Sequence, residues 1–247
     1  MLAMICKAVC GLKTTQMKHI VIDECQDFSP FQIELLKEAN RAATFTLVGD
    51  LYQGIRADEG IRRWEEWKGP VFEERAELKQ LTVSYRNTVE IMNLAQKTAG
   101  RYPIPGICET KPVLRHGAEP RIIRAENEKT RLALIREQVR KWKQEGYHSI
   151  ALIEKTTEQA KKLFRQAGAE LDAHLLSETD SEYRGGVLIL PASIAKGMEF
   201  DCVGICDASD ENFPEDEFLC RVLYVMMTRP LHRLCIWHKG APSPMLP

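Results

Sequence analysis

The chain has 247 residues, of which 44% are hydrophobic, 28% charged and 7% aromatic. This composition is typical of a globular protein, so it excludes a collagen-like or low-complexity chain and argues against global disorder. The formal net charge of −1 argues against a protein that coats nucleic acid, because such binding needs a surplus of Lys and Arg, but it permits a local basic groove. No apolar run reaches membrane-spanning length, so we expect no transmembrane helix. The length allows one or two domains.

The eight cysteines lie mostly inside apolar runs, such as the run 203–206. This placement predicts buried free thiols in a reducing, cytoplasmic compartment. Cys6/Cys10 and Cys202/Cys206 share a four-residue spacing, which is a weak metal signal because no His or third Cys completes either site. Core thiols are the favoured interpretation.

Short apolar runs alternate with amphipathic segments along the chain. The first part predicts strands at 19–22 and 45–49 with a helix at 31–39 between them. A second helix is predicted at 89–99. The Pro/Gly-rich stretch 102–106 follows and predicts a break or an irregular crossover.

After this break the alternation becomes more regular, and the apolar tail 241–247, with three prolines, is expected to be flexible. Strands that alternate with helices predict a parallel sheet covered on both faces, in which ligands bind beyond the carboxyl ends of the strands. The predicted elements are a strand at 121–124, a helix at 128–143, a strand at 149–153, a helix at 158–166 closed by Gly168, strands at 187–190 and 203–206, a helix at 219–228 and a strand at 233–237.

Two adjacent carboxylates, Asp23 and Glu24, directly follow the predicted strand 19–22. Carboxylates at the end of a buried strand are costly as unpaired charges, and a divalent cation would offset that cost. One carboxylate can hold Mg²⁺, directly or through water, while the next orients an attacking water. The alternative is an ordinary helix start, because Asp27 and Ser29 are good helix caps.

Polar side chains also follow the strand 45–49 and the segment 81–84. Gly49 permits a tight turn, and Gln53 is an uncharged donor suited to a phosphate. Arg86 offers a planar cationic fork for phosphate oxygens, and the adjacent Tyr85 is suited to stacking on a base. Taken alone, each of these segments is compatible with a plain turn.

A third polar segment, Lys196–Asp201, follows the predicted strand 187–190, and Arg229 ends an apolar helix. A charged side chain in that place suggests a buried partner such as phosphate. The alternative is a cation that complements the negative end of the helix dipole.

Together, these segments resemble the motifs of the UvrD/Rep-type superfamily 1 helicases, in family order and over most of the chain. The amino-acid sequence of Val83–Met92 is more similar to that of the HelD branch, which is associated with bacterial RNA polymerase recycling. The segments that look like motifs II, III, IV, V and VI are, in that order, Asp23–Asp27, Gly49–Gln53, Tyr85–Arg86, Lys196–Asp201 and Tyr224–Arg229.

The resemblance implies an α/β fold of RecA-like parallel sheets with helices on both faces. The expected organisation is a remnant of a first RecA-like domain at 1–84, a complete second one at 85–240 and the flexible tail. The implied function is an ATP-dependent motor that couples hydrolysis to movement on nucleic acid. Its implied cofactors are ATP and Mg²⁺, and its implied partners are single-stranded DNA and RNA polymerase.

The resemblance also implies roles in hydrolysis. Asp23 binds Mg²⁺, directly or through water, and Glu24 polarises the hydrolytic water. Gln53 contacts the γ-phosphate. Arg86 and Arg229 are the arginine fingers that stabilise charge in phosphoryl transfer.

Four further residues are implied to bind the nucleotide. Tyr85 stacks on the adenine and Glu199 reaches the ribose. Lys196 and Gly197 belong to the same motif V loop as Glu199.

One departure from the family pattern is large, because Gly-x-x-x-x-Gly-Lys-Ser/Thr occurs nowhere in the sequence, which begins only about twenty residues before Asp23. Without the backbone N–H groups and the Lys of that loop, a triphosphate loses its main anchor. We therefore expect a C-terminal motor half that is inactive without an N-terminal helicase part.

The alternative is a hydrolysis-incompetent module that binds nucleic acid or RNA polymerase. It would use a basic set on the predicted helix 128–143, although a solvated helix face is the favoured interpretation of that set. Its members are Arg131, Arg136, Arg140, Lys141 and Lys143.

Overall fold

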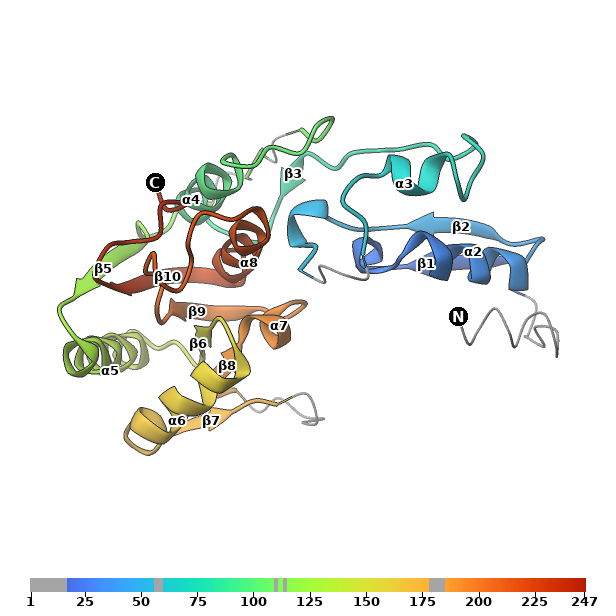
Figure 1. Ribbon diagram of the computed structural model, residues 1–247. Coiled ribbons are helices and arrows are strands. Elements are labelled where there is room, and N and C mark those ends of the chain that lie inside the picture. The colour runs from blue at the N-terminus through green and yellow to red at the C-terminus, as the bar shows by residue number, and fades with distance from the viewer. Residues whose placement is uncertain (1–16, 56–59, 109–110, 113–114, 178–184) are drawn as a thin grey trace. The chain divides into compact units, whose positions relative to one another are not determined.

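The computed structural model describes residues 17–55, 60–108, 111–112, 115–177 and 185–247 (Figure 1). The chain forms two compact units, Met1–Lys79 (unit 1) and Gln80–Pro247 (unit 2). Each unit contains parallel strands and helices, so the predicted α/β class is confirmed. Within the described ranges, no helix is both long and apolar enough to cross a membrane. Cys6 and Cys10 lie outside these ranges.

Unit 1 is built on two parallel strands, β1 (His19–Ile22) and β2 (Thr44–Leu47), which α2 (Pro30–Ala39) connects. The helix begins after Ser29, whose hydroxyl accepts from the backbone N–H of Gln32 while the Gln32 side chain accepts from the Ser29 N–H. Such a capping box satisfies two N–H groups that have no partner within a helix. These three elements confirm the predicted strand–helix–strand order.

Three short helical turns complete the described part of unit 1. They are η1 (Cys25–Asp27), η2 (Leu51–Gln53) and α3 (Glu65–Lys68). Elements of three or four residues carry no periodic pattern, so the sequence did not predict them. The segment after α3 reaches α2, because Lys37 Nζ donates to the carbonyl oxygen of Val71 (2.5 Å).

Unit 2 contains a six-stranded sheet in which all pairs are parallel, in the order β5-β10-β9-β6-β8-β7. A short pair, β3 (Val83–Ser84) and β4 (Lys111–Pro112), stands apart from it. The strands of the large sheet are β5 (Arg121–Ala125), β6 (Ser149–Glu154), β7 (Ala173–Leu175), β8 (Gly186–Pro191), β9 (Phe200–Ile205) and β10 (Pro230–Lys239).

Helices cover both faces of this sheet (Figure 1), as the sequence predicts. The helices α5 and α6 pack on one face, while α4, α7 and α8 pack on the other. The bounds are α4 (Val89–Ala99), α5 (Glu128–Gln144), α6 (Thr157–Leu171), α7 (Ala192–Ala195) and α8 (Glu217–Met227).

The core on the α5 side is packed around two tryptophans. Trp142 of α5 and Trp237 of β10 are both buried. A Cβ atom on Gly204 would lie 2.7 Å from the Trp237 ring and 2.9 Å from Leu152 Cδ2. Because protein cores are packed as densely as organic crystals, the glycine in the middle of β9 is what leaves room for this ring.

Two sequence predictions, one about the end of α6 and one about the C-terminal segment of the chain, are wrong. Gly168 does not close α6, which continues to Leu171 and ends at Asp172 with φ +51°. The missing side chain of Gly168 instead leaves room for the ring of Phe164, since a Cβ there would lie 2.6 Å from that ring. The segment 241–247, expected to be flexible, packs against unit 2.

The contacts of this last segment are specific. Ser243 N–H donates to the carbonyl oxygen of Ala208 (2.8 Å), and Asp210 N–H donates to that of Ala241 (3.0 Å). Met245 is 1% exposed. Apolar burial therefore orders a segment that its three prolines made appear loop-like.

The cysteines are mostly buried, as predicted. Within the described ranges Cys108 is exposed, whereas Cys25, Cys202, Cys206, Cys220 and Cys235 are buried free thiols.

The predicted solvated face of α5 is wrong for Arg131, which is buried. Its guanidinium donates to the carboxylates of Glu154 (3.2 Å) and Glu128 (2.8 Å) and to the carbonyl oxygen of Cys206 (2.7 Å). Arg131 therefore joins α5 to the ends of β6 and β9. Sequence periodicity missed this because an arginine on an amphipathic helix is normally solvated.

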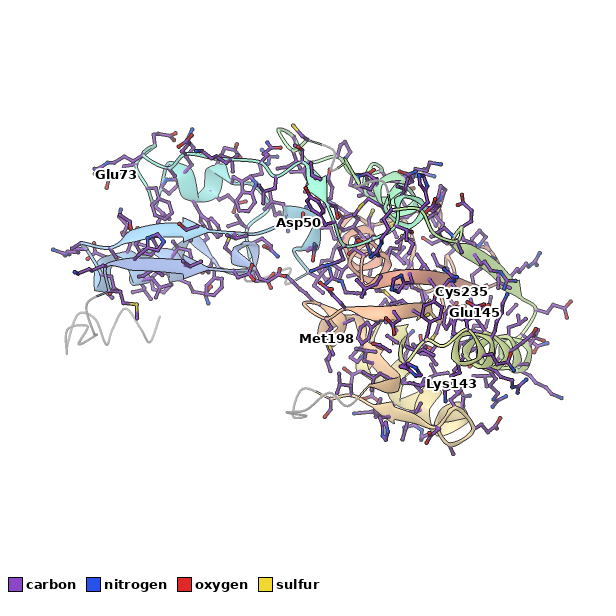
Figure 2. The ribbon with its side chains drawn as sticks, turned by 180° about the vertical axis from the view of Figure 1, so that it is seen from behind. Asp50, Glu73, Lys143, Glu145, Met198 and Cys235 are labelled. Carbon is purple, nitrogen blue, oxygen red and sulfur yellow. The ribbon has the colours of Figure 1, made fainter. Side chains whose placement is uncertain are left out.

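Two more of the basic side chains on α5 contact α6. Arg136 forms an ion pair with Glu170 (2.7 Å), and Lys143, labelled in Figure 2, donates to the carbonyl oxygen of Leu171 (3.0 Å). The charges on this helix are thus partly used within the fold.

The buried pair makes a prediction about pH. Burial is the largest influence on Glu154 and raises its pKa to about 7, while Arg131 acts in the opposite direction. The Glu154 carboxyl therefore binds a proton at a higher pH in the folded chain than in the unfolded chain. Protonated Glu154 thus stabilises the fold at low pH, and this stabilisation is lost as the pH rises from about 4.5 to about 7.

We expect Glu154→Gln to gain stability relative to the wild type between pH 5 and pH 7.5, by at most about 3 kcal/mol. Urea denaturation of both proteins at each pH measures this. Glu158→Gln, at an exposed carboxylate, is the matched control and should show no such trend. A pH-independent difference for Glu154→Gln would contradict the prediction.

Candidate functional site

The acidic pair lies in a separate turn and is not the start of α2. Asp23 is exposed, and its Oδ1 accepts from the backbone N–H of Glu24 (2.8 Å). Glu24 adopts φ +49° and ψ +38°, a left-handed conformation that costs a non-glycine residue about 1–2 kcal/mol. Because Ser29 caps α2, the helix-start interpretation does not account for the two carboxylates.

Gln26 holds the loop after β1 against the loop after β2. Its side chain is fully buried; Nε2 donates to Glu24 Oε2 (2.6 Å), and Oε1 accepts from the backbone N–H of Asp50 (3.0 Å). A Cβ on Gly49 would lie 2.3 Å from this Oε1, so Gly49 permits close approach of the two loops. Gln26 lies within the motif Asp23–Asp27, but its position in the sequence predicts no role for it.

The predicted residue Gln53 is held within its own turn. Asp50, labelled in Figure 2, accepts from the backbone N–H of Tyr52 through Oδ1 (2.9 Å) and from Gln53 Nε2 through Oδ2 (2.9 Å). Through Asp50 and Gln26, the Gln53 turn is connected to the Glu24 carboxylate. The carboxyl ends of β1 and β2 therefore carry one connected polar group in unit 1.

Two predicted residues of unit 2 meet across a long stretch of sequence. Arg86 Nη2 lies 2.6 Å from Glu199 Oε1, and both side chains are partly exposed, at 37% and 43%. Tyr85, beside Arg86, is 77% exposed. The guanidinium of Arg86 thus pairs with the carboxylate of Glu199, and the exposed ring of Tyr85 is next to Arg86 in the sequence.

The loop before Glu199 is shaped by a glycine. Gly197 has φ +79°, which glycine adopts without the steric cost of a Cβ. Lys196, at the end of α7, is partly buried, and Met198 N–H donates to the carbonyl oxygen of Ala195 (3.1 Å). This turn brings Glu199 to the start of β9.

Arg229 is fully buried. Its Nε donates to the carbonyl oxygen of Val225 in the last turn of α8 (3.1 Å), and Nη2 donates to Thr228 Oγ1 (3.2 Å). Its Nη1 reaches the carbonyl oxygen of Met198 (3.4 Å), the residue before Glu199. These contacts match the interpretation of a cation at a helix C-terminus, and they tie Arg229 to the Glu199 loop.

The two groups occupy different ends of their strands. In unit 1, Asp23 and Gln53 follow strands, as the rule of carboxyl ends predicts. In unit 2, Glu199 directly precedes β9, and Arg229 directly precedes β10. The expectation of polar clusters just after the strands is therefore incomplete.

The carboxylate oxygens of Asp23 and Glu24 suit a metal ion that takes its remaining ligands from a phosphate. Within the described ranges, no group of three or more His, Cys, Asp or Glu is arranged to hold a metal ion. Mg²⁺ commonly binds one or two carboxylates and takes its other ligands from water and substrate phosphates. Asp23 and Glu24 fit that pattern.

Cys25 is inert in this loop. Burial is the main cause that raises the pKa of its thiol to about 12, so the thiolate that would react or bind metal is suppressed. The prediction of buried core thiols agrees with that environment.

Comparison with known proteins adds an independent finding. Residues 8–57, which include both polar loops of unit 1, match the family model of the UvrD/REP helicase N-terminal domain. The chain is similar to the C-terminal domain of a possible DNA helicase from Lactobacillus plantarum WCFS1, with 24% identity, a TM-score of 0.55 and coverage of 66% of this chain and 91% of that one. This similarity shows the fold of helicase RecA-like domains.

A second solved structure, the PRRSV helicase, is 14% identical with a TM-score of 0.48, and the match covers 91% of this chain and 36% of that one. No curated protein matches the chain. The HelD branch stays a prediction.

The left-handed backbone of Glu24 has an effect on folding stability that can be measured apart from the effect of its charge. We expect Glu24→Gly to be more stable than Glu24→Ala by about 1 kcal/mol, because both lose the carboxylate but glycine alone adopts this φ freely. Urea denaturation followed by circular dichroism measures the difference. At Asp27, which has no positive φ, the same pair of variants should show the opposite order. Equal stability of the two Glu24 variants would rule out the strain.

Proposed function

We propose that the chain forms part of a nucleic-acid-dependent ATPase of the UvrD/Rep helicase kind. The observation that carries this proposal is the connected polar group at the ends of β1 and β2, where Gln26 joins the Glu24 carboxylate to the Asp50 turn. The family match at residues 8–57 covers this group. The fold of helicase domains supports the same conclusion.

In this proposal, unit 1 prepares the attacking water. Mg²⁺, when bound with a nucleotide, neutralises charge on the phosphate oxygens. Asp23 holds the ion, directly or through water, and Glu24 orients a water for attack. Gln53, fixed by Asp50, contacts the terminal phosphate.

Unit 2 supplies the groups that stabilise developing charge. Arg86 acts on the phosphates, Glu199 binds the ribose and Tyr85 stacks on the base, with Lys196 and Gly197 shaping the loop. Arg229, predicted as a second arginine finger, is fully buried, and in this proposal it holds the Glu199 loop through the carbonyl oxygen of Met198. The ion pair of Arg86 with Glu199 is partly exposed, and such pairs contribute only about 0–1 kcal/mol. Phosphate can therefore replace the carboxylate at little cost.

The proposed partners are a helicase N-terminal part and single-stranded DNA. No Gly-x-x-x-x-Gly-Lys-Ser/Thr is present, so hydrolysis requires a polypeptide that supplies this phosphate-binding loop. Single-stranded DNA is the proposed track. The buried free thiols suit a reducing, cytoplasmic compartment.

The alternative, a binding module without hydrolysis, loses at least two of its five basic residues on α5 to contacts within the fold. Arg131 is buried against Glu154, and Arg136 is paired with Glu170. RNA polymerase as a partner stays a prediction of the sequence.

The test is ATP hydrolysis with and without single-stranded DNA, for the chain alone and for the chain mixed with a helicase N-terminal domain that contains the phosphate-binding loop. We expect turnover only in the mixture. Glu24→Gln and Arg86→Ala should each reduce it by at least about a hundredfold. Calorimetry with Mg²⁺ and a non-hydrolysable ATP analogue reports binding separately.

Two outcomes would contradict this proposal in different ways. Turnover by the chain alone, abolished by Glu24→Gln, would show that another element replaces the phosphate-binding loop. Turnover in the mixture that neither variant changes would show that these residues take no part. Glu158→Gln, at an exposed helix carboxylate, controls for charge removal.

A further inference from the structure

A buried amide joins the chain beside Arg86 to the chain on both sides of Arg229. Asn87 is 3% exposed. Its Nδ2 donates to the carbonyl oxygens of Thr228 (3.2 Å) and Pro230 (2.6 Å). Both N–H groups of one side chain are thus used on the two residues that flank Arg229.

A second side chain makes a parallel connection. Arg115 Nη2 donates to the carbonyl oxygen of Arg86 (2.7 Å) and to that of Leu231. The carbonyl oxygen of Arg115 in turn accepts from the N–H of Val89 at the start of α4 (3.0 Å). Two direct hydrogen bonds from Asn87 and one bridge through Arg115 therefore link 86–87 to 228–231.

The physical need for these bonds is local. Carbonyl groups at the end of a helix have no partner within it, and a buried carbonyl without a partner costs about 1–3 kcal/mol. Thr228 ends α8, and Pro230 begins β10. Asn87 satisfies the carbonyls at this junction from another element, and so it fixes that element to the junction.

We propose that Asn87, assisted by Arg115, is a positioning residue that fixes the spacing between Arg86 and Arg229. This inference rests on the proposed function, in which Arg86 acts on the phosphates and the buried Arg229 holds the Glu199 loop. Because the side chain of Asn87, next to Arg86, donates to the backbone on both sides of Arg229, it holds the backbone at the two arginines at one spacing. Misplacement of a charged group by about 1 Å can cost a hundredfold in rate.

The amide acts through the two arginines and not on the nucleotide. It is buried, and both of its N–H groups are used on carbonyl oxygens. Its loss should therefore lower kcat more than it raises KM, since ground-state binding keeps its other contacts.

The test compares Asn87→Ala with a control at the opposite end of the same helix pair. Cys220 in α8 is buried, and its Sγ donates to the carbonyl oxygen of Thr98 in α4 (3.1 Å). Cys220→Ala therefore removes a buried contact between α4 and α8 but leaves the arginine junction intact. Asn87→Ser, which keeps one donor, is the conservative variant.

The first measurement needs no nucleotide. In the ¹⁵N-arginine NMR spectrum of the full chain, Asn87→Ala should shift or broaden the Nε–H signals of both Arg86 and Arg229. Cys220→Ala should leave both signals in place, and Asn87→Ser should give intermediate shifts. Unchanged signals in Asn87→Ala, or equal changes in Cys220→Ala, would overturn the proposal.

The second measurement is ATP hydrolysis in the mixture with the N-terminal domain. Asn87→Ala should lower kcat at least tenfold and change KM less than threefold, with partial recovery in Asn87→Ser. A loss of kcat equal to that of Cys220→Ala would mean a purely structural role. If the mixture hydrolyses no ATP, the proposed function fails, and the arginine signals still decide this inference.

Discussion

The amide of Asn87 donates to the carbonyl oxygens on both sides of Arg229, and the amide of Gln26 joins the Glu24 carboxylate to the Asp50 turn. Both side chains are buried, and both link loops that lie far apart in sequence. A buried amide is stable only when its polar atoms are satisfied. Each amide therefore specifies one arrangement of its loops, and the remaining candidate residues take their positions from it.

Two ion pairs with the same chemistry have opposite consequences because their burial differs. Arg131 and Glu154 are both buried, and Arg131 also donates to the carbonyl oxygen of Cys206, so separation would leave a charge in the core. Arg86 and Glu199 are partly exposed, so their separation is cheap. The first pair holds strand ends together, and the second is free to exchange its partner.

The distribution of charge in unit 2 follows from this difference. At the carboxyl end of β6, Glu154 meets Arg131, so that end of the sheet is satisfied internally. Glu199, proposed to bind the ribose, precedes β9 instead, and Arg229, which holds its loop, precedes β10. Unit 1 keeps its polar group at the carboxyl ends of its strands. Proteins built from similar parallel sheets can thus present function at either end of a strand.

The sequence by itself determined the longer strands and helices and the order of the motif segments. The helix Val89–Ala99 was predicted with the observed bounds, because its apolar period is a local property. Tertiary structure decided the burial of Arg131 and the bridging role of Asn87. It also decided that α6 continues beyond Gly168, because the ring of Phe164 occupies the space that a Cβ at position 168 would need. Periodicity records which face of an element is apolar, but a contact between residues distant in sequence exists only once both elements have packed.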